Sequence, residues 1–263
     1  MTLRNYGLNP LHLFLVGKFD KEKVDNAYTL YNVGTASYGG GATVFWQVDI
    51  DGQVRGGKVM VYDSATGHRS HAKGASWAHS LMKTPDYHLK QCLFGEHLLT
   101  ANPYKPVALV ESEKTCLIGH ILMPDMLWLA TGGKAGCFNQ EACRVLEGRD
   151  VLVIPDLGAM DDWRKKTNLI LKPICKSVKI YEDLERIATP EQRAAGLDIA
   201  DFLLEEFDSK GQPIGEPGQP SGPYPPPADM TDRVAFDWLK AHRPDFAKFV
   251  DGLGLELVDC HTG

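Results

Sequence analysis

The sequence predicts an α/β protein in which an open parallel sheet flanked by helices follows an α+β lobe with antiparallel strands. From Lys105 onward, short apolar runs alternate with helical segments, which is the pattern of a parallel sheet with helices on both faces. Before that point, two strand-like runs flank Asp51-Gly52, a dipeptide that favours a tight hairpin turn. An antiparallel hairpin therefore precedes the parallel sheet.

The first lobe is expected to span residues 1–104. Apolar residues at helical spacing predict helices within residues 9–31. The four glycines of residues 34–42 are expected to form a turn, although such glycines also allow close approach to a ligand. Strands are expected over residues 43–49 and 54–62, on the two sides of the hairpin turn.

The second lobe is expected to span residues 105–210. Its predicted elements are strands at 106–110, 127–130, 150–154 and 177–181, and helices at 113–122, 139–146, 160–175 and 198–207. Prolines and glycines dominate the region after it, so residues 211–229 are expected to be an extended linker. Residues 230–263 are expected to form a small helical tail that docks on the body or binds a protein partner.

Composition and charge narrow the function classes. No apolar run approaches the roughly 18 residues that span a bilayer, and no secretory signal pattern is visible, so a cytoplasmic protein with no membrane partner is expected. Six cysteines occur without a CxxC pair, which gives a zinc finger no support.

The net charge of −6 is unevenly distributed along the sequence. The first 104 residues hold ten Lys and Arg against eight Asp and Glu, and the remaining residues hold eighteen Lys and Arg against twenty-six Asp and Glu. This fits a mildly basic lobe beside an acidic one, and chance scatter explains it equally well.

Carboxylates stand at the ends of two predicted parallel strands. Glu111 follows the first strand and Asp156 follows the third, and the carboxyl ends of parallel strands meet at one edge of a sheet. Either residue alone is explained by the preference for acidic side chains at helix N-termini. Two at matching strand ends favour a shared divalent cation, and oxygen ligands of this kind suit Mg²⁺.

Basic and aromatic residues lie close together in the sequence of the first lobe. Lys58, Arg69 and Lys73 accompany Trp77, and interleaved charges and aromatic rings suit single-stranded nucleic acid. The simpler interpretation is a solvated hairpin face, which the sequence alone favours.

Four segments of the second lobe, in the correct order, resemble the Toprim domain of plasmid and phage primases. They are VESEKT at residues 110–115, ATGG at 130–133, VIPD at 153–156 and GLDIADFL at 196–203. The strands before them are similar to the β region that precedes Toprim domains in primase-like proteins. The chain thus resembles an uncharacterised family of primase-like proteins of bacterial mobile elements, in which a zinc ribbon often comes first; this sequence shows no such ribbon.

The resemblance implies roles for individual residues. Glu111 would be the family's acid/base or metal-linked glutamate, and Asp156 the first of its paired metal aspartates. The second aspartate should lie two residues on, where this chain has Gly158. The residues that could replace it as metal ligands are Asp161, Asp162, Asp198 and Asp201. The candidates for phosphate contact are Lys114, Lys134 and Arg149, for each of which a surface salt bridge is the simpler interpretation.

The expected function is therefore primase-like nucleotidyl or phosphodiester chemistry in DNA replication. The resemblance implies Mg²⁺ as cofactor, with Mn²⁺ as a substitute, and nucleic acid, single-stranded DNA in particular, as partner. The alternative is a DNA-binding or replication-accessory protein without catalysis, built on a degenerate Toprim scaffold, and Gly158 favours it.

Overall fold

The computed structural model describes residues 6–206 apart from 71–73, 84–86, 88 and 134–135. All of these belong to one compact unit, Met1–Pro213, and a second unit comprises Ile214–Gly263. The predicted linker at 211–229 and the predicted tail at 230–263 lie outside the described residues. Within the described part, no helix combines the length and the apolar character needed to cross a membrane.

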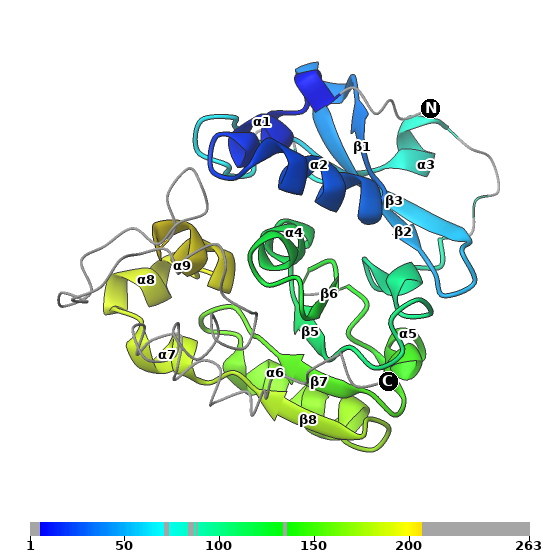
Figure 1. The fold of residues 1–263 in the computed structure, drawn as a ribbon, viewed down its shortest axis with the longest axis vertical. Coiled ribbons are helices and arrows are strands. Elements are labelled where there is room, and N and C mark those ends of the chain that lie inside the picture. Colours follow the sequence, from blue (N-terminus) through cyan, green and yellow to red (C-terminus); the bar gives the residue numbers. More distant parts are fainter. Residues whose placement is uncertain (1–5, 71–73, 84–86, 88, 134–135, 207–263) are drawn as a thin grey trace, which may run out of the picture. The chain divides into compact units, whose positions relative to one another are not determined.

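The first lobe contains a four-stranded sheet in which every neighbouring pair is antiparallel (Figure 1). Its order is β1 (Val33–Ala36), β2 (Ala42–Val48), β3 (Val54–Met60) and β4 (Ser76–Trp77). The β2–β3 hairpin turns at Gly52, whose φ of 77° favours glycine, so the hairpin prediction is confirmed. The expectation of a turn throughout residues 34–42 is wrong, because β1 occupies its beginning.

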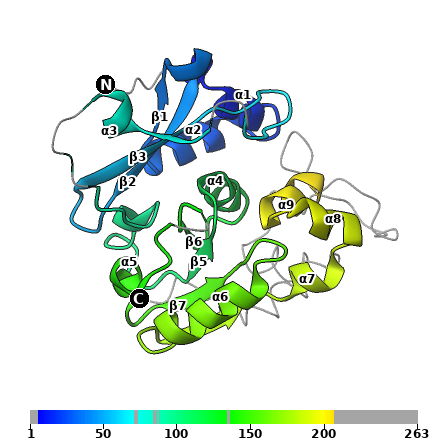
Figure 2. The same ribbon diagram turned by 180° about the vertical axis from the view of Figure 1, so that it is seen from behind.

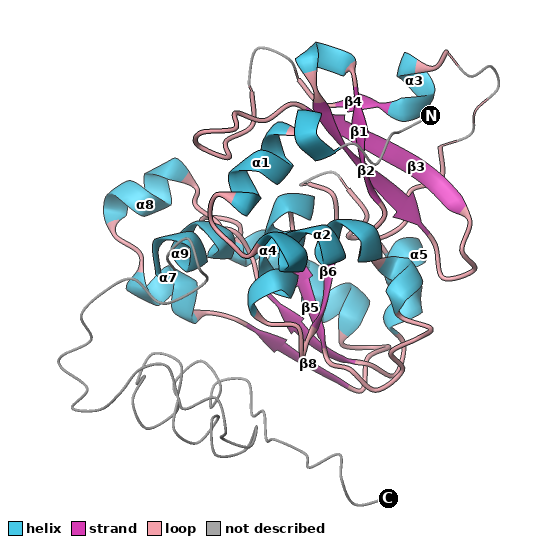
Figure 3. Ribbon diagram, turned by 45° about the horizontal axis from the view of Figure 1, so that its top comes forward, coloured by secondary structure: helices cyan, strands magenta, loops and turns pink. Residues whose placement is uncertain are grey.

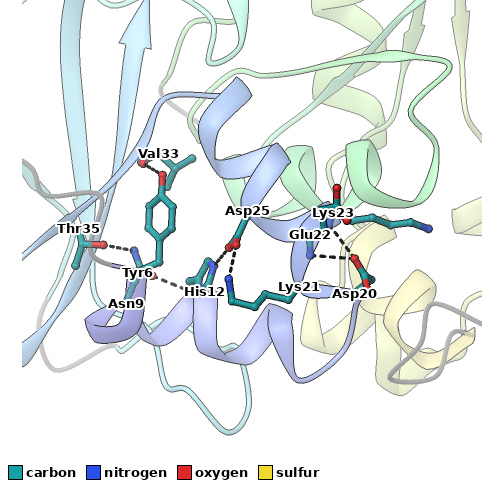
Figure 4. A network of polar contacts seen from close by, with 10 residues as sticks. All are labelled: Tyr6, Asn9, His12, Asp20, Lys21, Glu22, Lys23, Asp25, Val33 and Thr35. Atoms are coloured by element: carbon teal, nitrogen blue, oxygen red, sulfur yellow. Dashed lines mark hydrogen bonds and ion pairs between the residues drawn. The ribbon is translucent and has the colours of Figure 1, made fainter.

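Helices α1 (Pro10–Val16) and α2 (Lys21–Leu30) precede this sheet, as the apolar spacing predicts. Helix α1 begins after Asn9, whose side chain accepts a hydrogen bond from the His12 backbone N–H, and α2 begins after Asp20. Figure 4 shows how polar contacts join them: His12 Nε2 lies 2.7 Å from Asp25 Oδ1 on α2. The short helices of this lobe are η1 (Tyr6–Leu8), η2 (Tyr38–Gly40), α3 (Ala78–Leu81) and η4 (Glu96–Leu98).

The second lobe contains the predicted parallel sheet. Its strand order is β6 (Leu127–Ala130), β5 (Val107–Val110), β7 (Asp150–Val153) and β8 (Ser177–Ile180), and all three pairings are parallel. The first three strands are almost wholly buried, as expected for strands covered on both faces, whereas β8 is an edge strand with alternating exposure. The fold class predicted from the sequence is confirmed.

Helices connect these strands in the order that the apolar pattern predicts. Ser112 caps α4 (Glu113–Leu122), α5 (Gln140–Cys143) continues into η5 (Arg144–Leu146), and α6 (Met160–Lys166) continues into the π-helical η6 (Thr167–Leu171). Strand β6 lies on one side of β5 and β7 on the other, so right-handed crossovers place α4 on one face of the sheet and α6 on the opposite face (Figure 2).

Up to residue 206, where the description ends, three helices follow β8, and only the last of them is predicted from the sequence. They are α7 (Asp183–Ile187), α8 (Pro190–Ala195) and α9 (Ile199–Glu206). Thr189 and Gln192 form a reciprocal capping box that starts α8. These short helices return the chain to α4, against which α9 packs.

The two sheets are joined through a shared core. The Tyr31 hydroxyl donates to the Trp128 carbonyl at 3.0 Å, and Phe94 forms an isolated β-bridge with Ala130 at the end of β6. Phe45 of β2 packs edge-on against Phe94 with ring centroids 5.5 Å apart. Helix α4 packs against both α2 of the first lobe and β6 of the second (Figure 3). The boundary at residues 104 and 105 stays a prediction.

We expect Gly119→Ala to destabilise the protein. A Cβ at Gly119 would lie 2.3 Å from ring atoms of Trp128, which is completely buried. Overpacking of this kind costs about 1–3 kcal/mol, which outweighs the ~1 kcal/mol that alanine gains in helix propensity. Thermal unfolding followed by circular dichroism measures the net loss. Gly74→Ala is the control, because a Cβ there meets nothing within 4 Å; equal melting temperatures for the two variants would contradict the packing of α4 on Trp128.

Candidate functional site

The two carboxylates that the sequence singles out follow neighbouring strands. Strands β5 and β7 pair directly, with Leu109 opposite Val153, so Glu111 and Asp156 emerge side by side at the carboxyl edge of the sheet. Helices α4 and α6 leave these strands toward opposite faces. Such a switch point opens a crevice between the two strand ends, where ligands of open α/β sheets bind.

Electrostatics show that four carboxylates converge here. The pKa of Asp156 is raised to about 8, first because the side chain is desolvated, and then because of the negative charges of Asp198, Glu111 and Asp201. The structure therefore brings Glu111 and Asp156 together, as the sequence predicts, and adds two aspartates from the start of α9. We call these four residues the carboxylate cluster.

The two aspartates from α9 also have a structural role. Asp198 is buried, and its Oδ1 accepts the backbone N–H groups of Ala200 and Asp201, while Asp201 Oδ2 accepts the N–H of Asp198. The Thr115 hydroxyl donates to Asp198 Oδ2, which ties α9 to α4. Burial and the charge of Asp201 raise the pKa of Asp198. Asp198 thus acts on the cluster mainly through its charge.

A lysine lies beside the cluster. Lys114 Nζ is 3.6 Å from Asp201 Oδ1, and its side chain is only 13% exposed. Its positive charge lowers the pKa of both Asp156 and Asp198, yet the pKa of Asp156 stays near 8. One ammonium group therefore compensates the negative charge only in part, and a divalent cation would relieve the remainder.

The loop after β6 contains Gly132 and Gly133 and contacts the backbone of Glu111; it is called the glycine loop below. The backbone N–H groups of Gly132 and Gly133 both donate to the Glu111 carbonyl oxygen, at 2.9 and 3.1 Å. Both residues have positive φ, 81° and 117°, a conformation that only glycine adopts without strain. The loop thereby fixes the backbone from which the Glu111 side chain extends.

A buried ion pair links this loop to the antiparallel sheet. Lys58 Nζ of β3 lies 3.0 Å from Glu113 Oε2 and donates to the Gly132 carbonyl oxygen at 2.8 Å. Lys58 is among the residues predicted from the sequence, whereas Glu113 is not. The available signal was the position of Glu113 one helical turn before Leu117, on the core-facing side of α4, where a charged residue needs a partner.

The other predicted cations have different surroundings. Arg69 is exposed, and it pairs with Tyr62 in an isolated bridge. The pKa of Tyr62 is raised by burial first and then by Glu113 and Asp198, while Arg69 lowers it. Trp77 stands opposite Lys58 in the β3–β4 register and therefore on the same face of that sheet. Lys73 and Lys134 lie outside the described residues.

Asp161 and Asp162 are exposed in the first turn of α6 and pair with basic residues of their own helix. Asp161 lies 3.8 Å from Arg164 and Asp162 lies 2.9 Å from Lys166. At the position where the Toprim resemblance implies a second aspartate, the backbone N–H of Gly158 donates to Glu185 Oε1 at 2.8 Å. The structure thus gives these two aspartates surface ion pairs, and the strongest charge effects on Asp156 come from other residues.

The donor chemistry of the cluster fits Mg²⁺, because hard cations prefer carboxylate oxygens and a cation would offset the burial and the neighbouring charges that raise the pKa of Asp156. In the part of the chain that the structure describes, no three Asp, Glu, His or Cys side chains are arranged closely enough to hold a metal ion. Metal binding would therefore require side-chain rearrangement within the cluster.

The fold and the site define an α/β protein with carboxylates at the switch point of a parallel sheet. The chain belongs to a family described as a domain of unknown function, DUF6371, whose model matches residues 9–157. No curated protein matches the chain.

Several solved primase structures are similar to the chain at low sequence identity. The primase fragment of the bacteriophage T7 primase-helicase is 15% identical, with a TM-score of 0.43 and coverage of 68% of both chains. A DnaG catalytic core is 13% identical, with a TM-score of 0.43 and coverage of 73% of this chain and 66% of that one. The RNA polymerase domain of Mycobacterium tuberculosis DnaG is 16% identical, with a TM-score of 0.40 and coverage of 68% and 57%.

We expect the metal-free protein to lose stability as the pH rises from about 5 to 8. An Asp carboxyl ordinarily titrates at 3.8 and that of Asp156 at about 8, so the folded protein binds the extra proton between these values. A folded state that holds more protons than the unfolded state becomes less stable as the pH rises. Melting temperatures measured in EDTA across this range should fall more steeply for the native protein than for Asp156→Asn.

Asp161→Asn is the matched control, because its side chain is 90% exposed and pairs only with Arg164 among the described basic residues. It should keep the steep pH dependence of the native protein. Parallel curves for the native protein and Asp156→Asn would contradict a raised pKa at Asp156.

Proposed function

We propose that the protein is a nucleic-acid-processing enzyme with a Toprim-like Mg²⁺ site that carries out primase-like nucleotidyl or phosphodiester chemistry on single-stranded DNA. The observation that carries this proposal is the placement of Glu111 and Asp156 at neighbouring strand ends, together with the pKa of Asp156, which burial raises first and the charges of Asp198, Glu111 and Asp201 raise further. Carboxylates are costly to hold together without a cation, and perturbed acids of this kind gather at functional sites. The ordered Toprim-like motifs around Glu111 and Asp156 support the same function.

In this proposal Glu111 and Asp156 hold the ion, Mg²⁺ or Mn²⁺ in its place, while Asp198 and Asp201 add negative charge from α9. When bound, the ion neutralises charge on a reacting phosphate. Glu111 also exchanges the proton of the attacking or leaving hydroxyl, a role that its place at the strand end supports. The glycine loop holds the backbone of Glu111 during this exchange.

In this proposal the first lobe, residues 1–104, contacts the nucleic acid, and the second lobe, residues 105–210, holds the metal ion. Arg69 is exposed and is suited to a phosphate contact. Trp77 is partly exposed opposite Lys58 on the antiparallel sheet, where its ring can stack on a base. Lys114 would exchange its contact with Asp201 for a phosphate when the metal enters.

A second candidate function is DNA binding without catalysis. Two observations favour it: Gly158 stands where the resemblance implies a metal aspartate, and Lys114 already supplies a positive charge beside the cluster. Under this alternative the lysine is the permanent counter-ion of the carboxylates, and no metal is needed.

Calorimetric titration with Mg²⁺ and Mn²⁺ separates these functions. We expect binding by the native protein and a loss of affinity of more than about tenfold in Glu111→Gln and in Asp156→Asn, because each substitution removes a ligand. Asp162→Asn removes the same charge from the exposed surface of α6 and should bind like the native protein. Absence of binding at millimolar metal would contradict the enzyme proposal.

Nucleotide incorporation and strand cleavage on single-stranded DNA should then depend on the same two carboxylates. Glu111→Gln is expected to abolish turnover and to leave DNA affinity nearly unchanged, whereas Arg69→Ala should weaken binding and its salt dependence. DNA binding by the native protein without either reaction, at saturating metal, would support the non-catalytic function instead.

A further inference from the structure

Lys58 is placed unusually for a residue expected to contact nucleic acid. Its side chain is only 13% exposed, and its ammonium group lies between a carboxylate that is 2% exposed and a backbone carbonyl, those of Glu113 and Gly132. A lysine ammonium has three hydrogen-bond donors, so these two partners already use most of its capacity. The role of Lys58 therefore lies inside the protein.

Hydrogen bonds connect Lys58 to the end of β5, where the candidate catalytic residue Glu111 lies. Lys58 donates to the Gly132 carbonyl, and the N–H of the same glycine donates to the Glu111 carbonyl, as does that of Gly133. A short path of hydrogen bonds thus runs from β3 of the antiparallel sheet to the backbone of Glu111. The flexible element on this path is the glycine loop, whose two residues can adopt many backbone conformations when they are not held.

We propose that Lys58 is a positioning residue: by holding the Gly132 carbonyl it fixes the glycine loop, and through the loop it fixes Glu111 for metal binding. The part that concerns metal rests on the proposed function, whereas the part that concerns the loop does not. Glu113 pairs with the ammonium group inside the protein, and Gly132 is the group on which Lys58 acts.

Glycine is required at residue 132 for two reasons that agree with this role. A Cβ there would lie 3.3 Å from Glu113 Oε1 and 3.7 Å from Gln47 Nε2, so the loop backbone passes close to both side chains. The positive φ would in addition strain any other residue. The loop is therefore shaped to bring its carbonyl to Lys58.

Two variants distinguish a role of Lys58 in holding the glycine loop from a role limited to the ion pair with Glu113. Lys58→Met alone would leave Glu113 buried without a partner and could unfold the protein, so we pair it with Glu113→Leu, which removes both charges together. Glu113→Gln instead removes the ion pair and leaves Lys58 able to donate to Gly132. Hydrogen exchange of the Gly132 and Gly133 amides reports on the loop, and calorimetry reports on Mg²⁺ affinity.

The expected result is that these amides exchange about five- to tenfold faster in Lys58→Met/Glu113→Leu, as for the loss of one hydrogen bond, and within twofold of the native rate in Glu113→Gln. Mg²⁺ affinity should fall in the first variant and persist in the second. Native exchange rates in the double variant, or equal acceleration in both variants, would overturn the proposal. Should the double variant not fold, Glu113→Gln decides alone: retained loop protection supports the role of Lys58, and lost protection overturns it.

Failure of this proposal and failure of the proposed function give different results. A native protein that binds no Mg²⁺ refutes the metal site, while the exchange rates still test whether Lys58 holds the loop. Weaker binding of single-stranded DNA by the double variant, with unchanged loop exchange, would show that Lys58 contacts the nucleic acid directly and would overturn its positioning role.

Discussion

The direct pairing of β5 with β7 is the constraint on which the site depends. It places Glu111 and Asp156 at adjacent strand ends, from which α4 and α6 leave toward opposite faces of the sheet. The segment at the start of α9 adds two more aspartates whose charges act on Asp156. The raised pKa of Asp156 shows that the electrostatic cost of this arrangement is not removed by Lys114. A carboxyl group whose pKa is shifted this far is typical of a functional site.

Residues of both lobes contribute to the surroundings of this site. The glycine loop, the buried Lys58–Glu113 pair and the Phe94–Ala130 bridge connect the antiparallel sheet to the parallel sheet near Glu111. The region that matches DUF6371, residues 9–157, contains both sheets up to β7 and ends immediately after Asp156. Both strand-end carboxylates and the lysine that holds the loop thus belong to the family region, whereas Asp198 and Asp201 follow it.

Much of this architecture can be predicted from the sequence, because continuous apolar runs and helical spacing are local signals. The four parallel strands, the Ser112 cap and the β2–β3 hairpin follow from such patterns. The meeting of Glu111 and Asp156 also follows, once the strands are known to be parallel. Strand β1 is not predicted because the glycines in and after it indicate a turn. Helices α7 and α8 are not predicted because they are too short to show a clear apolar period.

Side-chain partnerships could not be predicted in the same way. The pairing of Lys58 with Glu113 joins residues of β3 and α4 that are 55 positions apart; the position of Glu113 on the core-facing side of α4 indicates that it needs a partner, but the local sequence does not indicate which residue that is. Likewise, the sequence could not distinguish Asp198 and Asp201, which α9 brings to the cluster, from Asp161 and Asp162, which pair with residues of their own helix. Tertiary geometry decides both questions.

The most direct test is a carbon-13 NMR titration of the Asp156 carboxyl group, with and without Mg²⁺. We predict an apparent pKa near 8 in the absence of metal and a marked decrease when Mg²⁺ binds. A metal-free pKa near the ordinary 3.8, unchanged by Mg²⁺, would contradict the shared carboxylate site.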